Sequence, residues 1–532
     1  MTDRPHILLF NPDQYRGEAM GHMGNRAVQT PVLDSLVASD AVSFQGAFCQ
    51  NPVCTPSRCS FMSGFYPHVF GHRTMFHMLH PERGQTNLLR ILKENGYTVW
   101  WGGKNDLVPG QDGYDDHCTV KFRPTDADFR RWGHTPKPGL HSWTTWRGSP
   151  DGDNYYSFLA GRLPTDDDTI YCDGDWANVL GAVDFILSYQ GNEPLCIYLP
   201  LLYPHPPYGV EEPYYSSADR SKLPPRIPAP ADWAASGKPS ILAGIHERQR
   251  LREWPEERFQ ELRAVYYGMC ARIDFQFGLV LEALKKRGFY DETAAFFFSD
   301  QGDFTGDYGL VEKTQNTFED VLTRVPLVVK VPSGLVEGRG VSTSGQRREG
   351  RSTGVSTAMV ELLDIPATIF DLTGIDPGYW HFGRSLVPLL LGETDTHRDE
   401  VHCEGGRLRG EVAAMELESL AGRSNPEESL YFPRIGLQTS DEGTWHSKGT
   451  SIRTQRYKYV RRLYERDELY DLAEDPGEEH NVVEDPRMGS VLQEMRLRML
   501  SWYQETADVV PFQSDKREFT GFERNADRNP RA

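Results

Sequence analysis

Short runs of consecutive apolar residues recur along the chain, and polar residues directly follow those at 6–10 and 294–298. These runs occupy residues 6–10, 194–200 and 294–298. A run without polar alternation is typical of a strand that is covered on both faces, as strands of parallel sheets are. Residues 97–101 form a further predicted strand. The pattern therefore predicts a buried, parallel sheet.

Helical periodicity fills much of the chain between these strands. Apolar residues recur at helical spacing in residues 86–94, 176–189, 259–288 and 491–503. We expect the first of these helices to have Thr86 as its N-cap and to stop at Asn95-Gly96. Residues 110–169 and 211–256 have little periodicity and are expected to form long loops. Strands that alternate with helices indicate the α/β class.

The last third of the chain changes in character. Between residues 394 and 449 the composition becomes polar and acidic, which we take as a domain boundary, and residues 451–464 then alternate as strands do. We predict a large domain over residues 1–395, a smaller one over 396–505 and a charged tail over 506–532. The tail is expected either to be solvated or to embrace a neighbouring subunit in a homo-oligomer.

Composition narrows the range of partners. The 57 basic and 76 acidic residues leave a formal charge of −19, which argues against nucleic acid as a partner. No apolar run approaches the roughly 20 residues that span a bilayer. The N-terminus has no basic segment followed by a long apolar one, so we expect no signal peptide, no membrane association and a cytoplasmic location. Eight cysteines in 532 residues are too few for a disulfide framework.

Two predicted strands end in the same pair of residue types. Asp13-Gln14 follows the strand at 6–10, and Asp300-Gln301 follows the strand at 294–298, where Gly302 permits a tight turn. Open α/β sheets bind ligands at the carboxyl ends of their strands. Carboxylate and amide oxygens suit Ca²⁺ or Mn²⁺. A solvated turn would explain either pair alone, but their recurrence favours a metal site.

Residues 54–64 read C-T-P-S-R-C-S-F-M-S-G. A cysteine two residues before a proline, followed by Ser57-Arg58 and Ser63-Gly64, resembles the signature of the type I sulfatases of the alkaline phosphatase superfamily. In that family a formylglycine-generating enzyme oxidises the cysteine to formylglycine, an aldehyde whose hydrate is the nucleophile. One oxygen of this geminal diol attacks the sulfate ester, and the other hydroxyl later collapses the intermediate and expels sulfate. A buried, inert thiol is the alternative explanation of Cys54.

The resemblance implies a fold and a set of roles. The fold is a large mixed, mostly parallel sheet between helices, with a C-terminal subdomain of antiparallel sheet and helix. One divalent metal ion, Ca²⁺ in the first place or else Mn²⁺, would be bound by Asp13, Gln14, Asp300, Gln301 and the modified Cys54. Arg58 would orient and polarise the formylglycine. The Asp-Gln form of the pair is similar to that of bacterial phosphonate monoester hydrolases and related arylsulfatases.

Three further segments match the family in part. Lys104 in G-G-K-N-D and Lys313 match lysines that contact the sulfate, and His205 in P-H-P-P-Y matches a histidine at the ester oxygen. Asp106 stands where the family has a histidine, and it would either act as an acid or leave that role to another residue. For Lys104 alone, a solvated loop lysine would be the default.

Three functions remain open from the sequence. The first is hydrolysis of a sulfate monoester of an aryl alcohol, a sugar or a small alkyl alcohol. The second is hydrolysis of a phosphonate monoester or phosphodiester with the same nucleophile. The third is a non-catalytic binding protein that kept the fold.

Overall fold

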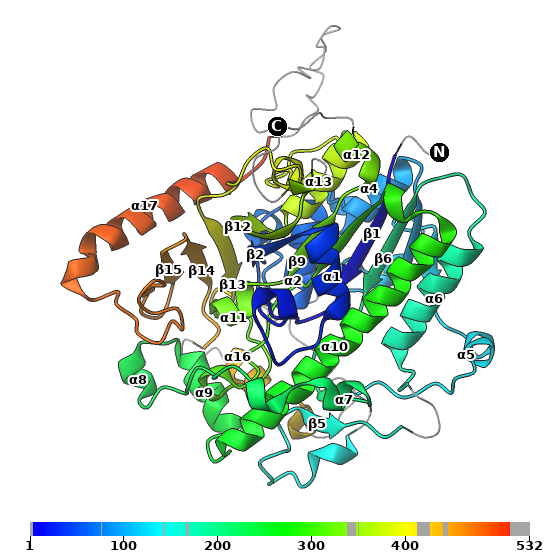
Figure 1. The fold of residues 1–532 in the computed structure, drawn as a ribbon. Helices are drawn as coiled ribbons and strands as arrows, with labels where there is room; N and C mark the ends of the chain where they lie inside the picture. The colour runs from blue at the N-terminus through cyan, green and yellow to red at the C-terminus, as the bar shows by residue number, and fades with distance from the viewer. Residues whose placement is uncertain are drawn as a thin grey trace, which may run out of the picture.

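The computed structural model describes residues 4–510 except residues 76, 141, 143, 166–169, 338–346, 349–350, 412–425 and 440–444. An eight-stranded sheet lies between layers of helices, and a four-stranded sheet with one long helix lies beside it (Figure 1). The predicted α/β class, with a mostly parallel sheet and a smaller α+β part, is confirmed.

The strands of the main sheet run in the order β12-β2-β9-β8-β1-β6-β3-β4. All neighbours pair in parallel except β9, which is antiparallel to both β8 and β2. The bounds of the eight strands are β1 His6–Asn11, β2 Val42–Phe48, β3 Thr98–Gly102, β4 Val120–Phe122, β6 Leu195–Pro200, β8 Thr293–Phe298, β9 Leu327–Lys330 and β12 Gly354–Glu361.

Strand β1 lies in the middle of the sheet and is buried along its whole length. Its side chains alternate between two cores: Leu8 and Phe10 belong to one hydrophobic cluster, and Ile7 and Leu9 to the other. Because successive side chains of a strand point to opposite faces, these two clusters are the two sides of the sheet. The continuous apolar run of β1 therefore packs against the helices on both faces of the sheet.

Different helices cover the two faces. Residues of α1 (Pro31–Ser39), α6 (Gly174–Ser188) and α10 (Glu256–Arg287) belong to the cluster of Leu8 and Phe10. Residues of α2 (Cys54–Ser63), α4 (Leu88–Glu94) and α13 (Asp364–Thr373) belong to the cluster of Ile7 and Leu9. Figure 1 shows α10 crossing the whole domain beside α6.

Shorter elements complete the described chain. The helices are α3 Pro67–Phe70, α5 Asp126–Trp132, α7 Tyr214–Ser217, α8 Trp233–Ser236, α9 Ser240–Arg248, α11 Asp320–Thr323, α12 Ser333–Glu337, α14 Val387–Leu390 and α16 Phe432–Gln438. Two small sheets pair β5 (Leu159–Arg162) with β7 (Tyr208–Val210) and β10 (Arg347–Arg348) with β11 (Arg351–Ser352).

The second sheet is antiparallel and runs β13-β14-β15-β16, with bounds Val401–Gly405, Gly449–Arg453, Tyr457–Arg462 and Glu468–Asp471. Helix α17 (Gly489–Thr506) packs Met495 and Met499 against Ile452, Tyr459 and Leu469 of this sheet. The predicted divisions after residues 395 and 505 remain predictions, and most of the tail, residues 511–532, lies outside the described residues.

Three local expectations need correction. The N-cap of α4 is Asn87, not Thr86, because the Asn87 side chain accepts a hydrogen bond from Arg90 N at 3.1 Å. The predicted loop at 110–169 contains α5 and the edge strand β4, whose three half-buried residues are too few for a periodic signal. The predicted loop at 211–256 contains α7, α8 and α9.

All eight cysteines are buried and free, as expected. In the described part of the chain, no helix combines the length and apolarity needed to cross a membrane.

Candidate active site

The two Asp-Gln pairs meet at one edge of the main sheet. Asp13-Gln14 follows β1 and Asp300-Gln301 follows β8, and these strands are parallel neighbours. Gln301 Nε2 donates to Asp13 Oδ1 at 2.8 Å, and Gln14 N donates to Asp300 Oδ1 at 3.1 Å. All four side chains are fully buried. Equal strand directions and adjacent positions thus bring together residues that are far apart in the chain.

Cys54 is the first residue of α2 and lies at this edge. Its Sγ is 3.4 Å from Asp13 Oδ1 and 3.3 Å from Gln301 Nε2. Burial and the negative charge of Asp13 raise the pKa of the Cys54 thiol to about 12, so the thiol is protonated near neutral pH. The positive end of the α2 dipole faces whatever group occupies this position.

Arg58 connects the two aspartates from one helical turn further along α2. Its Nη2 lies 2.7 Å from Asp300 Oδ2 and 3.1 Å from Asp13 Oδ2, and its Nη1 donates to Asn11 Oδ1 at 3.0 Å. Because residues four apart share a helix face, Cys54 and Arg58 present their side chains to the same site. Ser57 anchors the helix through a 2.6 Å hydrogen bond to Asp300 O.

Two lysines from different segments of the chain contact the strand-end cluster. Lys104 follows β3, and its Nζ lies 2.7 Å from Asp13 Oδ2 and 2.8 Å from Asp106 Oδ2. Lys313 Nζ donates to Gln14 Oε1 at 2.7 Å and to Glu312 Oε1 at 3.0 Å. Lys104 is about one-fifth exposed, whereas Lys313 is buried. Asp106 therefore acts as a partner of Lys104 in this arrangement.

His205 completes the group. One ligand atom each of Asp13, Cys54 and His205 lies within 4.8 Å of the others. His205 Nδ1 is 2.6 Å from the Pro206 carbonyl oxygen, which only accepts, so Nδ1 carries a proton. The segment P-H-P-P-Y thus places its histidine beside Cys54 and Asp13.

The pKa values of the two aspartates are shifted in opposite directions. Burial opposes ionisation of Asp13, but four cationic groups outweigh it and hold the Asp13 pKa well below its ordinary value: Lys104, His205, Arg58 and Lys313. Burial raises the pKa of Asp300 to about 6, with Arg58 lowering it and the charge of Asp13 raising it. Asp13 is thus the ionised carboxylate at the centre of the site.

The donor set fits a divalent cation. Asp13 supplies a carboxylate, and Gln301 Oε1 is buried without a hydrogen-bond partner among the described residues. A half-turn of the Gln301 amide exchanges its oxygen and nitrogen, which would direct that oxygen toward Asp13 and Cys54. The Gln14 oxygen is engaged by Lys313, and Asp300 is engaged by Arg58 and by backbone N–H groups. Hard oxygen ligands of this kind suit Ca²⁺ or Mn²⁺.

Sequence reasoning missed a layer of residues around the predicted ones. Asp303 accepts from Gln14 Nε2 and, at 2.8 Å, from Tyr208 Oη, and burial raises its pKa to about 6. Asp303 and Tyr208 lie close in sequence to the predicted residues Gln301 and His205, and this proximity could have identified them. Arg434 of α16 donates to the Lys313 carbonyl oxygen and pairs with Glu312, and nothing in its local sequence indicates this.

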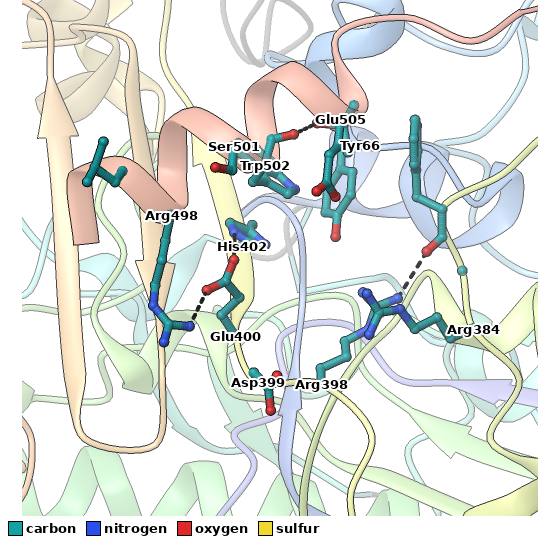
Figure 2. A pocket seen from close by; sticks show the side chains of 14 residues that line it. Tyr66, Arg384, Arg398, Asp399, Glu400, His402, Arg498, Ser501, Trp502 and Glu505 are labelled. Carbon is teal, nitrogen blue, oxygen red and sulfur yellow. Dashed lines mark hydrogen bonds and ion pairs between the residues drawn. The ribbon is translucent and has the colours of Figure 1, made fainter. Parts of the chain in front are cut away.

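A separate cavity of about 400 Å³ lies between α17, the start of β13 and the segment around Tyr66. Figure 2 shows His402, Trp502 and several arginines at its wall. None of the predicted site residues lines this cavity. The cavity is therefore separate from the strand-end cluster around Cys54.

The chain is similar to several known proteins along most of its length. A choline-sulfatase of Rhizobium meliloti (strain 1021) is 25% identical over 98% of this chain and 91% of its own length. Arylsulfatase K of Gallus gallus is 26% identical over 90% of this chain and 79% of its own length. The structure of the phosphonate monoester hydrolase of Agrobacterium radiobacter superposes with a TM-score of 0.69 at 23% identity, over 94% of this chain and 96% of that one. The fold is thus alkaline-phosphatase-like.

Family profiles match both parts of the chain. The profile described as N-sulphoglucosamine sulphohydrolase, C-terminal, matches residues 440–505, which contain β14, β15, β16 and α17. The sulfatase profile matches residues 5–375, which contain Asp13, Cys54, Asp300 and Lys313. Because this match spans more than half of the chain and includes the strand-end cluster, the protein belongs to the sulfatase family.

Proposed function

We propose that this sulfatase cleaves a sulfate monoester with a formylglycine made from Cys54, next to one divalent metal ion. The observation that carries the proposal is the position of Cys54 Sγ, 3.4 Å from Asp13 Oδ1 at the start of a buried helix, with Arg58 and Lys104 both on Asp13. An inert structural cysteine would need no such concentration of charge.

The nucleophile is the hydrated aldehyde at position 54. One diol oxygen attacks sulfur, and the bond between sulfur and the ester oxygen breaks, releasing the alcohol. The second hydroxyl of the diol then loses its proton and re-forms the aldehyde, which expels inorganic sulfate. Water restores the diol. Maturation would require a formylglycine-generating enzyme in the same compartment, for which we propose the cytoplasm.

The metal, which is Ca²⁺ or else Mn²⁺, would supply Lewis-acid stabilisation of negative charge on oxygen. Asp13 and Gln301 would hold it, with Asp300, Gln14 and the modified Cys54 completing the set. Arg58 keeps the two aspartates together while it orients the nucleophile.

The chain's own cations act on the sulfuryl group. Lys104, which contacts Asp13, and Lys313, which contacts Gln14, neutralise charge on the non-bridging oxygens as the bond breaks. His205, beside the nucleophile position, delivers a proton to the leaving oxygen. Asp106 holds Lys104 in place, and its role as an acid is secondary.

A second candidate function is hydrolysis of phosphonate monoesters or phosphodiesters. The Asp13-Gln14 pair, in place of two aspartates, is the observation that favours it. We do not favour the third hypothesis, a binding protein without activity, because the relatives include sulfatase enzymes.

The test begins with the state of Cys54. Protein produced with a formylglycine-generating enzyme is digested with trypsin, and the peptide of residues 27–58 should carry an aldehyde at position 54 in place of a thiol. The same sample should hydrolyse 4-nitrophenyl sulfate faster than a phenylphosphonate ester, and Cys54→Ala should abolish both activities. An unmodified thiol in fully active protein would contradict the proposal, and a faster phosphonate reaction would favour the second candidate.

A further inference from the structure

Arg434 is a buried arginine at the active site that the steps above do not use. It lies in α16, in the last third of the chain, and is 4% exposed. It donates to the backbone oxygen of Lys313 and pairs with Glu312 through Nη1. Lys313 in turn reaches Gln14, beside Asp13. Arg434 therefore contacts the backbone of Lys313, one of the two lysines proposed to bind the sulfuryl group.

The guanidinium lies over the Tyr431 ring, with its carbon 4.8 Å from the ring centroid, and one of its terminal nitrogens makes no hydrogen bond to a described residue. Arg434 Nη2 is buried and has no hydrogen-bond partner among the described residues. A buried cation without full compensation is costly, and guanidinium groups bind oxyanions in pairs of parallel hydrogen bonds. Glu312 alone does not fully compensate the positive charge of Arg434, because its carboxylate is shared between Arg434 and Lys313.

Arg462 provides an internal comparison. It is also buried and pairs with one carboxylate (Glu468, 2.6 Å) and one backbone oxygen (Asn316, 2.7 Å). Its Nη2 makes no hydrogen bond within the described part of the chain. The charges that act on Arg462 come from Glu468, Glu465 and Glu319, none of which is an active-site group. Arg434, by contrast, contacts Glu312 and the backbone of Lys313 and lies near Asp303 and Cys54, so its burial takes place beside the strand-end cluster.

We propose that Arg434 is a specificity residue that binds a second oxyanion, a carboxylate or a second sulfate, on the alcohol part of the substrate. This rests on the proposed sulfatase reaction at Cys54. The negative charge of the reacting sulfuryl group is already met by Lys104 and Lys313, whereas the free Nη2 of Arg434 matches a further anionic substituent. The substrate class is then the sulfate esters of anionic alcohols, such as acidic or multiply sulfated sugars and aromatic acids.

Three aryl sulfates test the proposal. 4-Carboxyphenyl sulfate and 1,4-phenylene disulfate carry a second oxyanion, and 4-carbamoylphenyl sulfate is a neutral isostere of the first. Arg434→Gln should lower kcat/KM for one or both of the anionic esters by about 10- to 100-fold, since charged hydrogen bonds contribute about 1.5–3 kcal/mol. The neutral ester should lose less than about threefold. A loss confined to 4-carboxyphenyl sulfate indicates recognition of a carboxylate, and a loss confined to 1,4-phenylene disulfate indicates recognition of a second sulfate.

Two further variants keep the result interpretable. Arg462→Gln removes the comparable arginine outside the site and should affect all three esters equally. The pair Arg434→Gln with Glu312→Gln removes both charges together, so that Glu312 does not lose one of its two cationic partners. Because this pair also takes a carboxylate from Lys313, it is judged by the ratio of kcat/KM for the anionic and neutral esters. Equal losses on the neutral and anionic esters, in folded protein, would overturn the proposal, because Arg434 would then act only on Lys313 or on the sulfuryl group.

A binding measurement separates this inference from the proposed reaction. Full-length Cys54→Ala protein, titrated calorimetrically with the carboxyphenyl, disulfate and carbamoylphenyl esters, should bind one or both anionic esters more tightly, and Arg434→Gln should remove that difference. Absence of turnover by modified wild-type protein would refute the proposed function. Equal binding of all three esters would refute the role of Arg434.

Discussion

Gln301 Nε2 lies 2.8 Å from Asp13 Oδ1, although 288 residues separate the two positions in the chain. The contact exists because β1 and β8 are parallel neighbours whose carboxyl ends meet at one edge. Arg58 also joins that edge from α2, so three distant segments share one buried charge cluster. Each part of the cluster leads to a measurable consequence.

Asp13 should be the residue that metal binding depends on most. Asp13→Ala removes the ionised carboxylate that contacts Cys54, Lys104 and Gln301. We expect metal affinity to fall by more than the roughly 10- to 100-fold that outer-sphere changes cause. Metal content after dialysis against a fixed concentration of free Ca²⁺ or Mn²⁺ measures this.

The matched control for Asp13 is Asp364, which is also fully buried and paired with an arginine, Arg398. Asp364→Asn should keep the metal content of the wild type, even where it lowers stability. Full metal occupancy in folded Asp13→Ala protein would contradict the assignment.

Arg58→Gln should destabilise the fold. It leaves Asp13 and Asp300 buried without the guanidinium that lies between them. Removing one partner of a buried ion pair commonly costs about 3–5 kcal/mol. Urea unfolding of metal-free protein measures the loss in the free energy of unfolding. Adding Asp300→Asn to Arg58→Gln should recover part of it, and a double variant less stable than the single one would contradict this explanation.

Lys104→Met should slow the reaction. The ammonium group lies at Asp13, where charge on the sulfuryl oxygens is to be stabilised. We expect kcat/KM for 4-nitrophenyl sulfate to fall by about 10²- to 10³-fold, the range observed for single oxyanion-stabilising groups. Lys121 on β4 is a suitable control, since its Nζ donates to the nearby Gly103 O. A Lys121→Met variant as slow as Lys104→Met would show that the effect is not local to the site.

His6 should make stability depend on pH, well away from the active site. Burial lowers the pKa of His6 to about 4, and its Nδ1 accepts a hydrogen bond from Leu195 N at 2.9 Å, which requires the unprotonated nitrogen. A depressed pKa means that the contribution of His6 is complete above pH 6.5 and is lost as pH falls from 6.5 through 4.

Thermal unfolding of wild-type and His6→Asn protein across that range measures this effect. The asparagine oxygen can still accept from Leu195 N, so the variant should lose less stability than the wild type between pH 6.5 and 4. The exposed His480 serves as a control, and His480→Asn should follow the wild-type curve. Parallel curves for wild type and His6→Asn would exclude His6 as the source.

Much of the fold followed from local patterns. The apolar runs at β1, β6 and β8 were visible because a strand buried on both faces needs apolar residues at every position. Strands β2 and β12 were not identified, since V-S-F-Q-G-A-F and G-V-S-T-A-M-V-E mix polar with apolar residues. The exposed and half-buried residues of β2, Gln45 and Gly46, lie in the middle of the strand, whereas those of β12 occupy its first half, and in both strands they interrupt the apolar run.

In the active site too, some features follow from local sequence patterns and others depend on the tertiary structure. By itself, the sequence determined which residues are the candidates for the chemistry, because Cys54 and Arg58 share a helix face and because Asp-Gln ends two buried strands. Only the tertiary structure decided how those groups pair: Lys104 on Asp13, Lys313 on Gln14 and Arg434 behind Lys313. Side chains within a turn or at a strand end follow backbone periodicity, whereas contacts across hundreds of residues depend on strand order and loop paths, which no local pattern encodes.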